Sequence, residues 1–311
     1  MRVIFMGTPD FSVGTLEAVL AAGHEVAAVV TQPDKPKGRG GAMSMSPVKE
    51  AALKHNLTVL QPQRAREEAF VEELRGYEAD VIVVVAFGQL LPAEIIHMPK
   101  YGCINVHASL LPKYRGAAPI QWAVINGEKV SGVTTMRMDE GLDTGDMILK
   151  EEVTLAPDET GGSLFDRLAE VGAKLAVQTL QALEDGTAEF TPQDHEKATQ
   201  VGMIKKSFGE MDFTKSAVEL ERLIRGLNPW PGTYTEYQGK TLKIWGATVK
   251  EGGDPSKAGT IVNVKKHSFG IQTKDGILVP TEIQLEGKKR MTTDAFLNGY
   301  TVEEGTYFTR G

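Results

Sequence analysis

Asn105, His107 and Asp143 are the side chains of this sequence whose types and spacing can perform acyl-group chemistry. They occur in residues 105–112 (NVHASLLP) and, about thirty-five residues later, in residues 141–146 (GLDTGD). Alternate side chains of a strand share a face, so Asn105 and His107 point the same way, with backbones roughly 6 to 7 Å apart. An imidazole exchanges protons near neutral pH, an amide donates to a developing oxyanion, and a nearby carboxylate can fix the imidazole tautomer. The pattern favours an acyl-transfer site, although each residue alone also fits a strand end, a core histidine or a turn.

The neighbouring residues strengthen the functional interpretation. Pro112 follows the apolar pair Leu110 and Leu111, which is typical of a strand that runs into a rigid loop, where functional groups concentrate. Gly141 and Gly145 flank the acid and permit tight backbone turns that aim its carboxylate inward. We therefore expect the two segments to build one site.

Cys103 is the single cysteine, and it lies on the same strand face as His107. Four strand residues separate the two by roughly 13 Å, which is too far for a nucleophile and its base. We expect Cys103 to be buried packing. A single cysteine excludes an intrachain disulfide and fits a reducing cytoplasm.

Composition excludes several classes of protein. The chain has 311 residues with a net charge of −7, no run of eighteen uncharged apolar residues and no cleavable signal pattern, so we expect no membrane partner and a cytoplasmic location. Residues 7–9 (GTP) lack the glycines of a dinucleotide-binding turn, and no phosphate loop is present. We expect no metal, because the remaining histidines form no ligand spacing: His24, His55, His97, His195 and His267.

The first half alternates apolar and amphipathic stretches, which predicts an α/β fold with a mainly parallel, Rossmann-like sheet. Strands are expected at 3–6, 25–31, 81–85, 102–107, 132–138 and 147–153, and helices at 16–22, 117–127 and 163–183. Residues 81–85 are apolar throughout, as in a central strand covered on both faces. Later, a helix at 216–226 precedes short strands at 233–237, 241–249, 259–264, 270–273 and 277–285. Such strands favour a small barrel, with Pro280 at an edge or bulge.

The sequence resembles the folate-dependent formyltransferase family over nearly its whole length. The resemblance is carried by residues 105–120 (NVHASLLPKYRGAAPI) and by GLDTGD at 141–146, MGTPDF at 6–11, TQPDKP at 31–36 and NPWPGT at 228–233. It implies a catalytic domain at 1–190, a linker at 191–208 and an OB-like, tRNA-binding barrel domain at 209–311. It also implies direct transfer of formyl from 10-formyltetrahydrofolate to the α-amino group of methionyl initiator tRNA, with Asn105, His107 and Asp143 as the catalytic residues.

Two segments are candidates for binding the folate. A pterin needs apolar walls and backbone groups that pair with its edge. The end of the buried strand can supply both through Phe87, Gly88, Gln89 and Leu90. The resemblance adds a second segment, Ser109, Leu110, Leu111 and Pro112. Arg115 and Gly116 follow closely and are expected to shape the same pocket. Ordinary packing at a strand end is the alternative.

The tRNA candidates are cations in two places. Residues 31–47 are predicted to form a long loop, broken by prolines and glycines, and the resemblance implies that it engages the acceptor end through Lys35, Lys37 and Arg39. This chain departs from the family after Gly40, where lysines are common. Lys205 and Lys206 open a region, 201–311, with sixteen Lys and Arg against thirteen Asp and Glu, whereas residues 1–200 are acidic. A solvated surface explains such charges equally well.

Two alternatives remain open at the level of sequence. The three catalytic candidates are expected to contact only the formyl group. An amino-sugar nucleotide, glycinamide ribonucleotide or water could therefore replace tRNA as acceptor. A noncatalytic RNA-binding protein is the alternative of another class, and the intact trio argues against it. We expect a monomer, although the sequence does not determine the oligomeric state.

Overall fold

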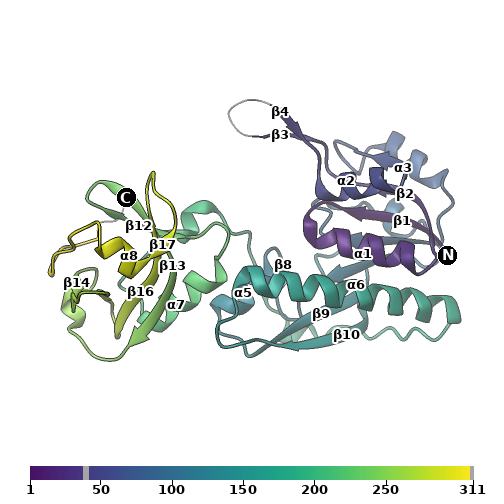
Figure 1. The fold of residues 1–311 in the computed structure, drawn as a ribbon. Coiled ribbons are helices and arrows are strands. Elements are labelled where there is room, and N and C mark those ends of the chain that lie inside the picture. The colour runs from purple at the N-terminus through teal and green to yellow at the C-terminus, as the bar shows by residue number, and fades with distance from the viewer. Residues whose placement is uncertain (38–41, 309–311) are drawn as a thin grey trace. The chain divides into compact units, whose positions relative to one another are not determined.

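The computed structural model describes residues 1–37 and 42–308, and it divides into two compact units (Figure 1). The first unit contains Met1–Pro119, Val130–Thr154 and Phe165–Val201, and the second contains Ile120–Lys129, Leu155–Leu164 and Gly202–Gly311. In the described part of the chain, no helix is long and apolar enough to cross a membrane.

The first unit holds eleven strands and four complete α-helices in the described residues. Its strands are β1 (Arg2–Gly7), β2 (Glu25–Val30), β3 (Lys35–Lys37), β4 (Ala42–Ser44), β5 (Val59–Leu60), β6 (Val81–Val85), β7 (Cys103–His107), β8 (Arg115–Gly116), β9 (Val130–Arg137), β10 (Asp146–Thr154) and β11 (Gln200–Val201). Its helices are α1 (Asp10–Ala21), α2 (Pro47–Lys54), α3 (Glu68–Arg75) and α4 (Ala93–Ile96). Two further helices, α5 (Pro119–Ile125) and α6 (Gly161–Asp185), contain residues of both units.

The main sheet of the first unit has the strand order β10-β9-β7-β6-β1-β2-β5. The pairs among β5, β2, β1, β6 and β7 are parallel, and β9 and β10 add antiparallel strands at one edge. The chain leaves β1 toward β2 and β5 and later returns to β6 on the other side of β1. In open sheets of this kind, ligands bind at the carboxyl ends of the strands beside such a reversal. The predicted Rossmann-like, mainly parallel sheet is confirmed.

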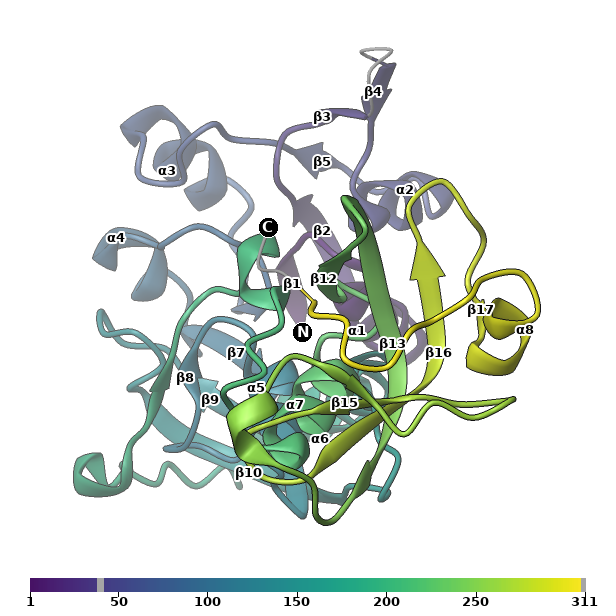
Figure 2. The ribbon, with the colours of Figure 1, turned by 90° about the vertical axis from the view of Figure 1, so that its left-hand side faces the viewer.

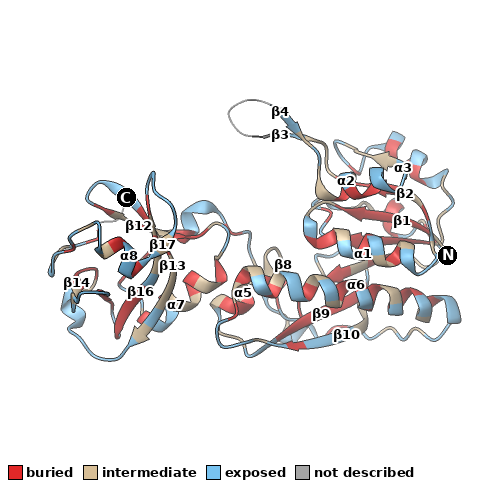
Figure 3. Ribbon diagram, in the orientation of Figure 1, coloured by how far each residue is buried: buried red, intermediate tan, exposed pale blue. Residues whose placement is uncertain are grey.

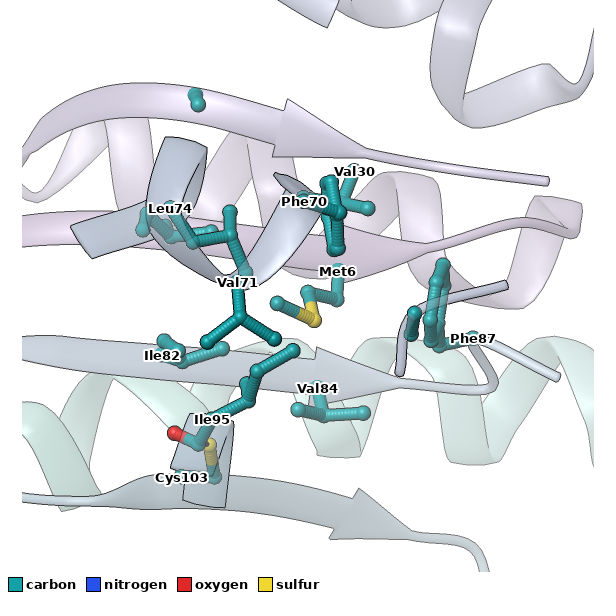
Figure 4. Packing of buried hydrophobic residues seen from close by; sticks show 13 residues of the cluster. Met6, Val30, Phe70, Val71, Leu74, Ile82, Val84, Phe87, Ile95 and Cys103 are labelled. Atoms are coloured by element: carbon teal, nitrogen blue, oxygen red, sulfur yellow. Dashed lines mark hydrogen bonds between the residues drawn. The ribbon is translucent and has the colours of Figure 1, made fainter. Parts of the chain in front are cut away.

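Strand β6 lies in the middle of this sheet, and all five of its residues are apolar and buried. On one face of the sheet, Phe70, Val71 and Leu74 of α3 pack with Ile95 of α4 against Ile82 and Val84 (Figure 4). Helices α1 and α6 lie on the other face, where Gly172 approaches Val106 and the rings of Phe11 and Phe165 meet edge to face at 5.3 Å. Burial therefore concentrates on the strands and on the inner faces of the helices (Figure 3).

The second unit is built on an antiparallel sheet with the order β12-β13-β16-β15-β14, and β17 pairs with β16 (Figure 2). Its elements are α7 (Ala217–Gly226), β12 (Thr233–Tyr237), β13 (Lys240–Lys250), β14 (Ile261–Val262), β15 (Gly270–Gln272), β16 (Ile277–Leu285), β17 (Met291–Thr292) and α8 (Thr293–Leu297). Helix α7 begins with a capping box between Ser216 and Glu219. Pro280 lies opposite Ala247, beside a register shift at Gly246, as a strand proline requires. The predicted barrel-like unit is confirmed.

Within the segment 31–47, predicted to be a continuous loop, the described residues include two paired strands. Strand β3 pairs antiparallel with β4, and Pro36 lies opposite Met43 (Figure 1). Both strands are short and largely exposed, so no alternation of buried and polar residues marks them in the sequence. Arg39 lies outside the described residues.

Cys103 belongs to the core on the α3 and α4 face of the sheet (Figure 4). Its side chain is fully buried, and its Sγ lies 3.5 Å from the carbonyl oxygen of Ile95. Burial raises the pKa of the Cys103 thiol to about 12. The prediction that this residue is packing is confirmed.

We expect the Cys103 thiol of the native protein to resist a thiol reagent such as Ellman's reagent at pH 8, since only the thiolate reacts and burial disfavours it. One thiol per chain should react after unfolding in urea. Rapid stoichiometric labelling of the native protein would contradict the burial of this residue.

Candidate functional site

The three catalytic candidates meet at the carboxyl end of β7. Asn105 and His107 belong to β7 and share a face, while Asp143 lies in the loop between β9 and β10. The Nδ2 atom of Asn105 lies 3.5 Å from Oδ1 of Asp143, and Nδ1 of His107 lies 3.8 Å from Oδ2. The structure therefore brings together the trio that the sequence singled out.

His107 is held by a backbone carbonyl group. The ring is 7% exposed, and its Nε2 atom lies 2.9 Å from the carbonyl oxygen of Tyr114. Because a carbonyl oxygen only accepts hydrogen bonds, Nε2 carries a proton and Nδ1 faces Asp143. The expectation that Asp143 fixes the tautomer is therefore corrected, since Tyr114 fixes it and the carboxylate acts on the other nitrogen.

Asp143 reaches the site through an unusual backbone conformation. Its φ angle is 54°, in the left-handed region that few residues other than glycine adopt. Its Oδ2 atom accepts a hydrogen bond of 2.7 Å from the N–H of Gly116. Gly145 is required nearby, because a Cβ atom there would lie 1.9 Å from the carbonyl oxygen of Arg137. The loop is thus tightly turned, as the flanking glycines predicted.

This arrangement can stabilise negative charge on a reacting carbonyl oxygen. One Asn105 amide proton faces Asp143, which leaves the second for a ligand, and a protonated His107 adds another donor. Asp143 offsets the positive charge that the ring then carries. The neighbouring Ser109 is not arranged as a nucleophile, since its hydroxyl donates to the carbonyl oxygen of Lys113 at 2.6 Å and is buried.

The loop after β6 offers a backbone surface. The ring of Phe87 is buried in the core (Figure 4), and its carbonyl oxygen accepts from Thr8 Oγ1 at 2.9 Å. Among the described residues, the N–H groups of Gly88, Gln89 and Leu90 have no hydrogen-bond partner. The Leu90 side chain is 83% exposed. This loop therefore presents an apolar side chain and uncommitted donors, whereas Phe87 serves as its anchor.

Gln89 secures the same loop to the neighbouring segment. Its Oε1 atom accepts from the N–H of Ala65 at 2.8 Å, and its Nε2 atom donates to the carbonyl oxygen of Pro62 at 3.2 Å. The side chain of Gln89 is thus engaged within the protein, and its backbone is what remains for a ligand.

The segment after β7 alternates buried and half-buried residues. Ser109 and Leu111 are buried, and Leu110 and Pro112 are half-buried. Thr134 fixes this segment, because its hydroxyl donates to the Ser109 carbonyl oxygen at 2.7 Å and accepts from the Leu111 N–H at 3.1 Å. No local pattern signals this role of Thr134.

Gln193 is the main site residue that sequence reasoning missed. It lies in the segment predicted to be a polar connection, yet it is 5% exposed and contacts the Asp143 loop and Arg115. The nearby strand β11 pairs with β8, which brings this part of the chain to the site. No local pattern could have revealed a contact fifty residues away in sequence.

The cations proposed for tRNA are distributed over both units. Lys35 is exposed on β3 of the first unit, and Lys205 and Lys206 are exposed in the second. Lys37 ends β3, and Arg39 lies outside the described residues.

Two family models match the chain. The formyl transferase model covers residues 1–180, and the formyl transferase C-terminal domain model covers residues 203–301. Asn105, His107 and Asp143 lie in the first match, and the antiparallel unit occupies most of the second.

Similar proteins agree with these matches. The methionyl-tRNA formyltransferase of Agathobacter rectalis is 64% identical over 99% of this chain and 100% of its own length. Among solved structures, the N-formyltransferase from Helicobacter canadensis in complex with folinic acid and dTDP-3-aminofucose has a TM-score of 0.67 at 18% identity, covering 94% of this chain and 100% of its own. HypX from Aquifex aeolicus in complex with tetrahydrofolic acid has a TM-score of 0.63 at 18% identity, covering 100% of this chain and 51% of its own. With matched models over most of its length and a relative this similar, the chain belongs to the formyl transferase family.

Proposed function

We propose that this protein transfers the formyl group of 10-formyltetrahydrofolate to the α-amino group of methionyl initiator tRNA in translation initiation. The full-length likeness to a methionyl-tRNA formyltransferase at 64% identity carries this proposal. The convergence of Asn105, His107 and Asp143 supports the chemistry. An amino-sugar acceptor has weaker support, because the sugar formyltransferase resembles this chain at 18% identity, which speaks for the fold alone.

The mechanism is direct transfer without a covalent enzyme intermediate. 10-Formyltetrahydrofolate is the formyl donor, and negative charge develops on the formyl oxygen as the methionyl amine attacks the formyl carbon. The bond between that carbon and N10 then breaks and tetrahydrofolate leaves, with one proton lost from the attacking nitrogen and one gained by N10. The free amide proton of Asn105 donates to the formyl oxygen, and a proton on Nδ1 of His107, which is 3.8 Å from the nearest Asp143 oxygen, is the second donor. The Asp143 carboxylate faces that nitrogen through Oδ2.

The two folate segments fit a pterin. The exposed Leu90 side chain and the half-buried Leu110 and Pro112 provide apolar surface, and the N–H groups of residues 88–90 can pair with a polar ring edge. Buried Ser109, Leu111 and Phe87 hold these segments in place. Binding thus depends on backbone positions more than on the types of the exposed side chains.

The tRNA is proposed to contact both units. We assign catalysis to residues 1–190, connection to 191–208 and OB-like tRNA binding to 209–311, with Lys35, Lys37 and Arg39 toward the acceptor end and Lys205 and Lys206 on the phosphates. The basic balance of residues 201–311 supports this division. We further propose that the protein is monomeric and cytoplasmic. Light scattering of the purified protein tests the monomeric state.

The decisive assay supplies 10-formyltetrahydrofolate with a labelled formyl group. It is offered with methionyl initiator tRNA, methionyl elongator tRNA or an amino-sugar nucleotide. We expect label on initiator tRNA far above the other two. Label on the sugar alone would refute the proposed acceptor, and no transfer to any of them would refute the proposed reaction.

Substitution of the trio should impair chemistry rather than binding. His107→Ala and Asp143→Ala are each expected to lower kcat by about 10²- to 10⁴-fold, the usual contribution of acid–base and oxyanion groups. The Kd for tRNA should change little, as measured by filter binding. His55→Ala is the matched control, because His55 is exposed and pairs with Glu17, away from the Asp143 loop. Normal turnover of His107→Ala would contradict the assigned role.

The proposed phosphate contacts should appear in the salt dependence of binding. The double variant Lys205→Ala/Lys206→Ala is expected to reduce the slope of log Kd against log salt concentration by about 1 to 2, because each phosphate contact releases counterions. Lys257→Ala is the control, since this exposed lysine pairs with Asp254. An unchanged slope in the double variant would remove these lysines from the interface.

A further inference from the structure

We propose that Gln193 is a positioning residue that holds the Asp143 loop in its active conformation, and that Arg115 sets the direction of the Gln193 amide. The inference rests on the proposed function, because it concerns how the carboxylate of Asp143 is kept beside His107.

The Gln193 amide spans the turn that contains Asp143. Its Nε2 atom donates 2.8 Å hydrogen bonds to two carbonyl oxygens, those of Asp143 and Gly145. Both amide protons are thereby committed to the two sides of Thr144. The side chain is 5% exposed, so water does not readily replace these bonds.

Arg115 makes the orientation of that amide unambiguous. The Oε1 atom of Gln193 accepts from Arg115 Nε at 3.0 Å and from Nη2 at 2.7 Å. A flipped amide would set its protons against a guanidinium group that only donates, and its oxygen against carbonyls that only accept. Nη2 also lies 3.1 Å from Nδ1 of His195. Among the described residues no carboxylate forms an ion pair with Arg115, so its principal partner is Gln193.

The two hydrogen bonds from Gln193 act at a point where the backbone conformation is unfavourable. Asp143 has a φ angle of 54°, and such conformations persist only where surrounding contacts enforce them. The side chain of Asp143 is held by the N–H of Gly116, and its own carbonyl is held by Gln193. If the second contact is lost, the loop can relax and carry the carboxylate away from His107. Small displacements of this kind cost large factors in rate.

Two variants separate positioning from simple packing. Gln193→Glu keeps the size and the acceptor for Arg115 but replaces the donor by an oxygen that repels both carbonyls. Gln193→Met removes donor and acceptor without adding charge. We expect both to lower kcat by about 10- to 100-fold while the KM values for folate and tRNA stay within about threefold.

Gln272 provides a matched control in the second unit. It is 1% exposed, its Nε2 atom donates to the carbonyl oxygens of Thr273 and Gly276, and its Oε1 atom accepts from the N–H of Asp254. Gln272→Glu breaks the same set of bonds outside the site. We expect it to lower the Tm and leave kcat unchanged.

A double-mutant cycle and hydrogen exchange complete the test. In an Asp143→Asn background, Gln193→Glu should change kcat by less than about twofold, because its effect passes through the carboxylate. In the protein without substrates, exchange of the Gly116 amide proton should accelerate in Gln193→Glu and stay unchanged in Gln272→Glu.

The outcomes are distinct. Normal kcat and normal Gly116 protection in the Gln193 variants would overturn the inference, and so would an undiminished loss in the Asp143→Asn background. If wild-type protein transfers formyl to methionyl initiator tRNA while the variants behave normally, only this inference fails. If the wild type transfers none, the proposed function fails.

Discussion

The parallel strands of the first unit are covered on both faces, and this constraint governs where chemistry can occur. An unpaired polar group among Ile82, Val84 and their neighbours would lose hydrogen bonds to water without replacement. Polar function is therefore displaced to the strand ends, where loops can turn. His107 illustrates the boundary, since it is the last residue of β7 and its ring is almost buried.

A buried histidine imposes further requirements on the chain. Its Nε2 atom needs an acceptor, which the carbonyl of Tyr114 supplies, and this requires the chain to double back directly after the Leu111–Pro112 segment. The returning chain forms β8, which pairs with β11. Gln193 lies shortly before β11 in the sequence, so this pairing brings it to the Asp143 loop. Thus the polar contact of His107 at the edge of the core is accompanied by contacts with a segment that is distant in sequence. Gln193 itself is buried and bonded within the protein, whereas most residues of 191–200 around it are exposed.

Sequence predicts the elements whose reasons are local. Strand β6 matches its predicted bounds because five apolar residues in succession have no alternative to burial. Helix α7 begins at Ala217, directly after its N-cap Ser216, because the capping box is a local signal. Sequence could not predict the β3–β4 pair, whose short exposed strands lack a pattern, nor the role of Gln193. It found Asn105, His107 and Asp143 through their chemical types, but the Tyr114 contact that sets the tautomer depends on a fold-level turn.

The same reasoning explains why the trio alone does not choose an acceptor. Among the described residues, the hydrogen bonds and the ion pair that organise Asn105, His107 and Asp143 come from the first unit. Acceptor choice must come from surface that the catalytic geometry does not constrain. In this chain such surface includes the exposed strands β3 and β4 and the second unit. Surface charge there can vary because neither belongs to the buried parallel sheet of the first unit. A site of this kind can keep its chemistry while its acceptor changes, since the two are encoded by residues that do not share a core.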